Sequence, residues 1–334
     1  MNKNTFTAFG LECPPGQAIS SLVPVGELNI GVPVSLPVRI INGASDGPVL
    51  GMCAMVHGDE YNGYAAINEL FDSIDPQELS GALIGVPVAN PFALLTNRRI
   101  SDLEYERLNL NRVFPGTPGG FQMERVANQI FEEAIVRSDV WMDFHEGGRD
   151  FIARYLIVGV EEGMEQHLNR DLQLARWFGQ GIPITVTKLD AASRRLGRGG
   201  ASTVQAAMMG KGSLGIELGG GGVLHPEFIA QAVEGTRRVM VGLGMIDGEI
   251  PEDVEQTVSY STAWPRPNKG GFFEQCVFLG QIVEEGEVVG WIRDLFGQKV
   301  EEIRAPFRAV ITDTRHTATI QTGEWTVKCA RLDD

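Results

Sequence analysis

Three stretches of the sequence combine side chains that bind metal ions and move protons. His57 and Glu60 stand three residues apart, where an apolar segment ends and a helical pattern begins. An imidazole nitrogen and a carboxylate oxygen at this spacing can converge on one ion, and the pair suits zinc. His145 ends a second apolar segment and is followed by Glu146 and two glycines. Two histidines and one carboxylate are the protein ligands of a class of hydrolytic zinc sites that leave a fourth position for water.

The third stretch, SLGIELGGGG, places Glu217 in a strand-like segment shortly before four glycines. Water at a zinc ion needs a nearby carboxylate that takes its proton and later passes it to a leaving amine, and Glu217 is the candidate. Of the acidic residues beside His145, we expect Asp143 to bond to a ligand histidine and Glu146 to face solvent. The alternative interpretations are structural. They are a turn histidine with a first-turn carboxylate for His57 and Glu60, and a charged strand terminus for Glu217.

A cationic group follows in residues 90–116, NPFALLTNRRISDLEYERLNLNRVFPG. Its arginines are Arg98, Arg99, Arg107 and Arg112. A guanidinium binds carboxylates in a bidentate manner and also stabilises a developing oxyanion. Surface pairing with neighbouring acidic residues is the alternative for each of them.

Short apolar segments bounded by Gly, Pro, Asp or Asn alternate with helical patterns. The segments predict buried strands at 36–43, 47–56, 81–90, 139–145, 155–160, 183–189 and 212–218. Helical spacing covers 60–74, 121–137, 161–179 and 226–246. This alternation predicts an α/β domain whose mostly parallel or mixed sheet is flanked by helices on both faces. Reactive groups of such sheets gather at strand ends, where the three stretches lie.

The composition of the sequence changes after about residue 250, where a Pro-rich and charged stretch replaces the helical pattern. We therefore predict an α/β catalytic domain over 1–252, including an extended N-terminal segment. Residues 253–334, with short strands punctuated by glycine, predict a small all-β domain of barrel or sandwich type.

Composition excludes several classes of partner. The chain has 334 residues, 28 Lys and Arg against 43 Asp and Glu, and a formal net charge of −15. Without a basic run, this balance argues against nucleic acid and anionic membranes. The four cysteines are far apart in the sequence, which favours reduced thiols, and no secretory signal or long apolar span is visible. We expect a cytoplasmic protein, with homo-oligomerisation possible.

Taken in order, the motifs HGDE, NP with arginines, LNLNRVFPG, DFHEGG and GIELGGGG resemble the succinylglutamate desuccinylase/aspartoacylase family. The resemblance runs from about residue 45 to the end of the chain. It implies a zinc-carboxypeptidase-like α/β fold with one zinc ion per chain. It also implies hydrolysis of the amide bond of a small N-acyl amino acid or related N-acylated amine.

The resemblance also assigns roles to residues of this chain. His57, Glu60 and His145 match the zinc ligands, and Glu217 matches the general acid/base. Asn111 and Arg112 match the pair that holds a substrate carboxylate, although many members have Asp where this chain has Asn109. Arg99 is our choice for the group that polarises the scissile carbonyl, with Arg98 as the second candidate in the substrate site.

The acyl group stays open at this point, between acetyl, succinyl and others, with a slight preference for a bacterial deacetylase such as one for N-acetyl-diaminobutyrate. A carboxypeptidase acting on short peptides is one alternative. A carrier function of the C-terminal domain is a remote one, because Lys299 lacks the flanking residues of a biotinylated lysine.

Overall fold

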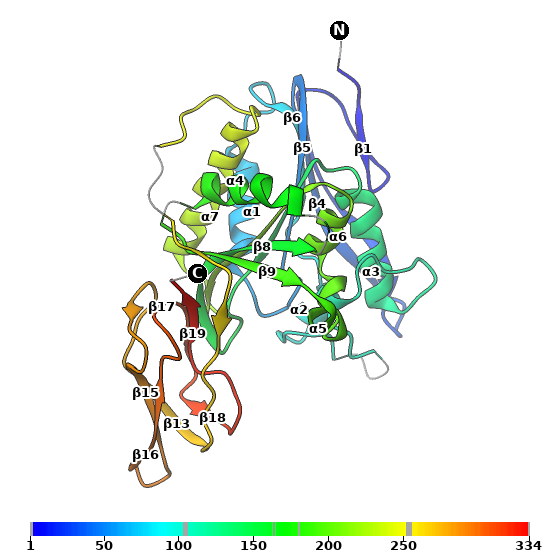
Figure 1. Cartoon of the computed structure of the whole chain (residues 1–334). Helices are drawn as coiled ribbons and strands as arrows, with labels where there is room; N and C mark the ends of the chain where they lie inside the picture. Colours follow the sequence, from blue (N-terminus) through cyan, green and yellow to red (C-terminus); the bar gives the residue numbers. More distant parts are fainter. Residues whose placement is uncertain are drawn as a thin grey trace.

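The computed structural model describes residues 3–102, 106–161, 163, 165–179, 181–251 and 256–332. A large mixed sheet runs through the molecule (Figure 1). Its strands are β3 (Gln17–Glu27), β4 (Pro33–Asn42), β5 (Ser45–Ala54), β6 (Ser80–Val86), β7 (Val140–His145), β8 (Phe151–Glu161), β9 (Ile184–Leu189), β10 (Gly212–Gly220), β11 (Val258–Ser259), β12 (Thr262–Ala263), β14 (Ile282–Val283), β17 (Ala309–Arg315) and β19 (Lys328–Arg331). The strand order is β12-β19-β17-β8-β10-β7-β5-β6-β4-β3, with β9 beside β8, β11 beside β9 and β14 beside β17.

The centre of this sheet is parallel, because β6, β5, β7 and β10 run in the same direction as neighbours. β8 continues the sheet from β10 in the antiparallel sense. Parallel strands end at one common edge, so the residues that follow β5, β7 and β10 are brought together there. Each predicted strand segment of the α/β part overlaps an observed strand.

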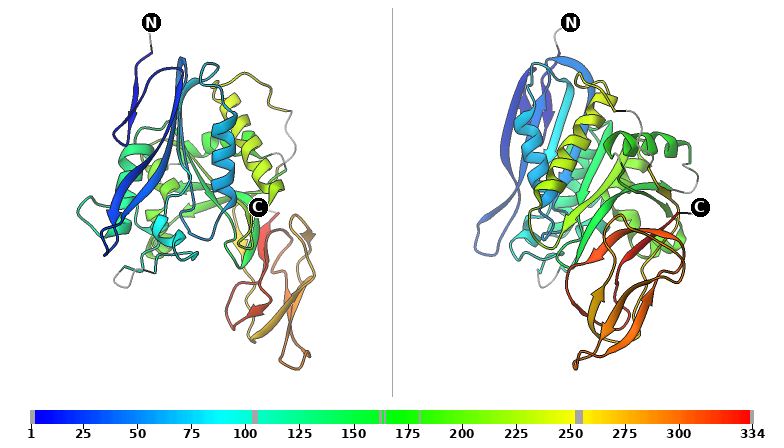
Figure 2. Two further views of the ribbon diagram at one scale, coloured as in Figure 1. Left: turned by 180° about the vertical axis from the view of Figure 1, so that it is seen from behind. Right: turned by 90° about the vertical axis from the view of Figure 1, so that its left-hand side faces the viewer.

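Helices cover both faces of the sheet (Figure 2). One core packs α1 (Asn62–Ser73), α4 (Leu168–Phe178) and α7 (Pro226–Gly242) on one face, and the other packs α3 (Gln122–Ile130) and α6 (Ser202–Met208). Side chains of β5 alternate between them, since Leu50 and Met52 enter the first core and Cys53 the second. In α1 the buried residues include Ile67, Leu70 and Phe71, as an amphipathic helix requires.

Shorter elements complete this part of the fold. They are β1 (Phe6–Ala8), β2 (Leu11–Cys13), α2 (Pro91–Leu94), α5 (Ala191–Arg195), the 3₁₀ turns at Leu110–Arg112, Glu165–His167 and Arg198–Gly200, and a π-helical turn at Phe131–Ile135. The sequence did not predict α5 and α6, which are only one or two turns long and lie in a Gly- and Arg-rich segment. Within the described residues, no helix is long and apolar enough to cross a membrane.

The C-terminal region forms a second, antiparallel sheet with its own apolar core. Its strands are β13 (Gly271–Gln275), β15 (Val288–Arg293), β16 (Lys299–Arg304) and β18 (Thr319–Ile320). It projects from the end of the molecule opposite the N-terminus (Figure 2). The predicted boundary between 252 and 253 lies outside the described residues, and the division into domains stays a prediction. Strands β17 and β19 nevertheless extend the large sheet beside β8.

Candidate metal centre and active-site pocket

His57, Glu60 and His145 meet at the edge where β5 and β7 end. Nδ1 of His57 lies 2.7 Å from Oε1 of Glu60, and Nδ1 of His145 lies 2.9 Å from Oε2 of the same carboxylate. One potential ligand atom from each of the three residues lies within 4.8 Å of the others. Since β5 and β7 are parallel neighbours, the sheet itself brings two distant parts of the chain together.

The donor set of this cluster fits a metal ion. His57 and Glu60 are each 2% exposed and His145 is 8% exposed. A buried carboxylate requires compensating positive charge, and two imidazole nitrogens with one carboxylate are a zinc donor set that leaves a position open. The three residues are therefore compatible with a metal site.

The charged and polar groups of the cluster shift one another's pKa values. Burial lowers the pKa of His57 to about 4, and the nearby Glu60 opposes this shift. Burial alone would lower the pKa of His145 as well, but Asp143 and Glu60 raise it well above its usual range. Burial alone would raise the pKa of Glu60, but the two histidines lower it below its usual range. The lowered pKa of Glu60 favours the ionised carboxylate, which is the form that binds a cation.

Asp143 lies behind His145, as the sequence predicts. Its Oδ2 is 3.2 Å from Nε2 of His145 and accepts a hydrogen bond from Ser202 Oγ. Trp141 Nε1 in turn donates to Ser202 Oγ over 3.0 Å, and Cys53 Sγ lies 3.3 Å from the other oxygen of Asp143. Such a chain of bonds fixes the orientation of a ligand imidazole.

The expectation that Glu146 faces solvent is wrong. Glu146 is 3% exposed and accepts hydrogen bonds from the backbone of Tyr61 and the side chain of Asn62. Burial, reinforced by the charge of Glu60, raises the pKa of Glu146 to about 8. The two donors lie 84 and 85 residues away in the sequence, at the start of α1, and could not be foreseen.

Glu217 lies on β10, directly between two neighbouring strands that carry site residues. It is opposite His145 of β7 in the parallel register and opposite Tyr155 of β8 in the antiparallel register. Burial raises the pKa of Glu217 to about 8; Glu60 and Asp313 act in the same direction, and His145 and Lys328 oppose them. A carboxyl group with a pKa in this range is suited to exchange protons near neutral pH.

The arginines of the 90–116 segment separate into two groups. Arg99 Nη1 donates to Glu60 Oε1 over 3.1 Å, so Arg99 lies at the cluster. Arg98 is two-thirds exposed and pairs with Asp102 at 3.2 Å, and Arg107 is exposed. The structure therefore brings Arg99, but not Arg98, to the candidate metal site.

Asn111 also reaches the cluster, and Arg112 lines the same pocket. Asn111 Nδ2 lies 3.4 Å from Nε2 of His145, and Asn109 caps the turn by accepting a bond from the backbone N–H of Asn111. The pKa of Arg112 is lowered by burial and by the charges of Arg99 and Arg198. Arg198 was missed by sequence reasoning because it lies 86 residues further along the chain, in an irregular Gly-rich segment.

One pocket of about 780 Å³, which is in the range of small-molecule sites, is lined by His57, His145, Glu146, Glu217, Arg99, Asn111, Arg112 and Arg198. The C-terminal region lines part of it through Trp264, Trp325, Asp313 and Lys328. Trp264 and Trp325 are stacked, with ring centres 5.0 Å apart. The pocket thus combines the two histidines of the candidate metal site, an aromatic wall formed by Trp264 and Trp325, and a cationic wall formed by Arg99, Arg112 and Arg198.

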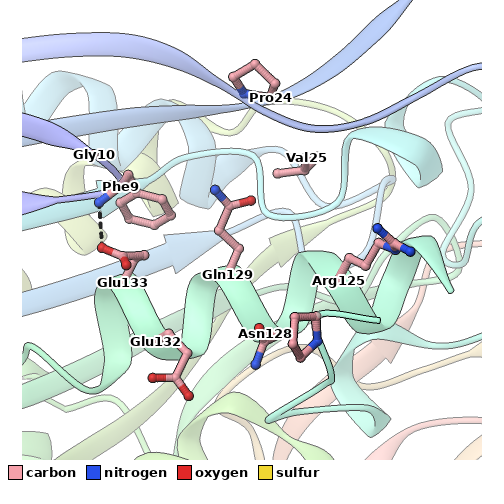
Figure 3. A pocket seen from close by; sticks show the side chains of 10 residues that line it. Phe9, Gly10, Pro24, Val25, Arg125, Asn128, Gln129, Glu132 and Glu133 are labelled. Carbon is pink, nitrogen blue, oxygen red and sulfur yellow. Dashed lines mark hydrogen bonds between the residues drawn. The ribbon is translucent and has the colours of Figure 1, made fainter. Parts of the chain in front are cut away.

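A second hollow, of about 510 Å³, lies between α3 and β3 (Figure 3). Figure 3 shows the carboxylate of Glu133 bonded to the backbone N–H of Phe9, with Pro24 and Val25 across the hollow; the bond is 2.7 Å long. Among its described lining residues there is no histidine or cysteine, and the carboxylate of Glu133 also binds Arg137. This hollow offers no group arranged for catalysis.

Comparisons with known proteins agree with the motifs. A model of the succinylglutamate desuccinylase/aspartoacylase catalytic domain matches residues 46–243. The N-alpha-acetyl-L-2,4-diaminobutyric acid deacetylase of Halomonas elongata is 30% identical over 298 residues, 87% of this chain and 84% of the relative.

Solved structures share the fold at lower identity. The product-bound ectoine utilization protein EutE (DoeB) from Ruegeria pomeroyi is 24% identical, with a TM-score of 0.81 over 94% of this chain and 95% of that one. A succinylglutamate desuccinylase from Silicibacter sp. TM1040 is also 24% identical, with a TM-score of 0.83 over 96% and 97%. A metallo-carboxypeptidase from Burkholderia cenocepacia reaches a TM-score of 0.50 at 13% identity over 67% and 64%, which supports the predicted carboxypeptidase-like fold. On the extent of the catalytic-domain match and the relationship to the Halomonas deacetylase, the chain belongs to the succinylglutamate desuccinylase/aspartoacylase family.

Proposed function

We propose that the protein is a zinc-dependent amidohydrolase that cleaves the acyl–nitrogen bond of small N-acyl amino acids. The observation that carries this proposal is the position of Glu217, which sits opposite His145 on the neighbouring strand, inside the pocket that holds the metal cluster. The name of the Halomonas relative, a deacetylase of an N-acetylated diamino acid, supports an acetyl or similarly small acyl group.

His57, Glu60 and His145 would hold the metal, and zinc is the ion that this donor set favours. A zinc ion bound there supplies Lewis acidity, which lowers the pKa of water and polarises a carbonyl group. Asp143 and Ser202 keep the His145 ring in its orientation through their hydrogen bonds.

Around that centre, the side chains of the pocket divide the remaining work. Glu217 accepts the proton of the attacking water and delivers it to the departing amine, for which its raised pKa is suited. Arg99, beside Glu60, donates to the oxygen that gains negative charge. Asn111 and Arg112 hold the carboxylate of the substrate, because a guanidinium and an amide can bind it together.

Elemental analysis and turnover test the proposal together. Purified protein should contain about one zinc ion per chain. His57→Ala and His145→Ala should lose the metal, whereas Glu217→Gln should retain it and lower kcat by about 100-fold or more. N-Acyl amino acids are assayed beside short peptides, so that a preference for peptides would identify the carboxypeptidase alternative. Protein that takes up no zinc, or a Glu217→Gln variant with near-normal turnover, would overturn the proposal.

The carrier alternative gains no support from the geometry of its lysine. The ammonium of Lys299 lies 3.4 Å from the ring centre of Trp291, at the start of β16. An intact mass without a biotin or lipoyl increment tests it.

The four free cysteines, Cys13, Cys53, Cys276 and Cys329, agree with the cytoplasmic location that we propose.

A further inference from the structure

The active-site pocket continues past Glu217 into a part that the proposed chemistry does not use. We name this part the apolar lobe. It is lined by Ile157, Gly159, Leu189, Val204, Ala207 and Gly215. None of these six side chains is charged, and Thr187 and Thr203 supply the hydroxyl groups nearby. An apolar cavity with few polar groups is a site for an apolar part of a ligand.

Strand register shows where the lobe begins. Glu217 faces Tyr155 across β10 and β8, and Gly215 faces Ile157 two residues further along. Because side chains alternate, Tyr155, Ile157 and Gly159 point to the same face of β8 as the pocket. With a rise of about 3.3 Å per residue, Gly159 lies about 13 Å along β8 from Tyr155. The lobe therefore leads directly away from the catalytic carboxylate.

Two glycines hollow the floor of the lobe. A Cβ atom built on Gly159 would meet no atom within 4 Å, although β8 lies between β10 and β9 in the sheet. Gly215 adds no side chain on the neighbouring strand, where a Cβ would meet Ile157 at 3.1 Å. The space above this floor is covered on one side by Val204 and Ala207 of α6.

The cationic wall lies beside the segment that leads into α6. A Cβ on Gly200 would lie 2.1 Å from the backbone oxygen of Arg112, and one on Gly197 would lie 3.1 Å from Cδ of Arg112. Phe114 N–H also donates to the Gly200 oxygen over 3.1 Å. The chain of residues 197–200 thus packs against Arg112 and brings Arg198 next to it. A carboxylate held by Arg112 consequently sits close to the helix that covers the lobe.

We propose that the apolar lobe binds the side chain of the amino acid whose carboxylate Arg112 holds, so that the preferred substrates are N-acyl derivatives of amino acids with large apolar side chains, such as leucine. This inference rests on the proposed function. The side chain and the carboxylate are bonded to the same carbon atom of the substrate, and the lobe is the apolar space beside Arg112. A short cationic side chain would lose hydration there without gaining a partner among the six lobe residues.

A substrate series tests the proposal on the zinc-loaded full chain. kcat/KM is measured for N-acetylglycine, N-acetyl-L-alanine, N-acetyl-L-leucine and N-alpha-acetyl-L-2,4-diaminobutyrate. The leucine derivative should exceed the alanine derivative by about 100-fold, as a filled hydrophobic pocket gives. A diaminobutyrate or glycine derivative that is hydrolysed with the higher kcat/KM would overturn the proposal.

Filling the lobe tests its location. Gly159→Val has room for its side chain and should lower the leucine-to-alanine ratio of kcat/KM at least tenfold. Gly119→Val is the matched control, since Gly119 is exposed, outside the lining of the pocket, and equally free of neighbours. If Gly159→Val folds and its leucine-to-alanine ratio of kcat/KM is unchanged, the substrate side chain does not bind in the lobe. If Gly159→Val does not fold, Ala207→Leu, which fills the lobe from α6, replaces it in the same test.

Binding separates this inference from the proposed function. Calorimetry with zinc-loaded Glu217→Gln measures the affinities for leucine and 2,4-diaminobutyrate without turnover. Tighter binding of leucine supports the lobe even if no N-acyl amino acid is hydrolysed by the wild-type protein, a result that would defeat the proposed function alone. Equal or weaker binding of leucine refutes the lobe.

Discussion

A buried ion pair in the C-terminal strands offers a quantitative test of the electrostatics beside the pocket. Lys328 and Asp313 face each other across β19 and β17, with Nζ 4.0 Å from Oδ2. They are 8% and 3% exposed, and the ammonium also lies 3.3 Å from the ring centre of Tyr155. Lys328→Met keeps most of the length of the side chain and removes its charge.

The expected loss follows from the carboxylate that remains. Breaking a buried pair by removing one partner costs about 3–5 kcal/mol, so we expect Lys328→Met to lower the free energy of unfolding by about 3 kcal/mol at pH 8. At pH 5 the carboxyl of Asp313 takes up a proton instead of remaining charged, and the loss should largely vanish. Combining the change with Asp313→Asn should recover about 2 kcal/mol at pH 8, because no unpaired charge is then buried.

The sign of the pH dependence can be worked out for Asp313 itself. Burial raises its pKa from 3.8 to about 6, with Lys328 opposing the shift. Below pH 3.8 the group is protonated in both states and contributes nothing. Between pH 3.8 and 6 the folded state binds more protons, so the unfolding free energy falls with rising pH, by about 3 kcal/mol in total. Asp313→Asn should remove this fall.

Urea unfolding followed by tryptophan fluorescence measures these free energies of unfolding. Trp264 is a suitable probe, since its ring centre lies 5.9 Å from the Lys328 ammonium. Wild type, both single variants and the double variant are compared at pH 5 and pH 8. An equal loss in Lys328→Met at the two pH values would show that packing over Tyr155, and not charge, is what the lysine contributes. That outcome would refute the reasoning.

Three further changes probe the site and the core. Ser202→Ala removes a donor to Asp143 and should weaken zinc binding 10- to 100-fold, measured by competition with a chelator; unchanged affinity would show that the chain of bonds behind His145 does not support the ligand. Arg112→Met should raise KM for an N-acyl amino acid at least tenfold with a smaller change in kcat. If only kcat changed in steady-state assays, the result would contradict the binding of the substrate carboxylate by Arg112. Leu70→Ala, at a fully buried position of α1, should lower the free energy of unfolding by about 2–5 kcal/mol, measured by urea unfolding. A loss below about 1 kcal/mol would mean that the core relaxes into the cavity that the substitution creates.

Periodicity and strand-end chemistry were sufficient to predict much of this molecule. The apolar segments ending near His57, His145 and Glu217 overlap the strands β5, β7 and β10, because short buried strands carry a local signal in their composition. The convergence of His57, Glu60 and His145 also follows from a general rule, since parallel strands end at one edge. Helices α1, α3, α4 and α7 were likewise visible in their spacing.

What the sequence by itself determined is therefore the order of the main strands and helices between residues 36 and 246 and the identity of the groups at the strand ends. Tertiary structure decided which distant side chains share a space: the burial of Glu146, the approach of Arg99 rather than Arg98 to Glu60, the approach of Arg198 to Arg112, and the apolar lobe beside Gly159. The physical reason is that propensity and periodicity act between near neighbours in the chain. Burial, charge and cavity shape are set by contacts across the whole fold, for which one sequence carries no local signal.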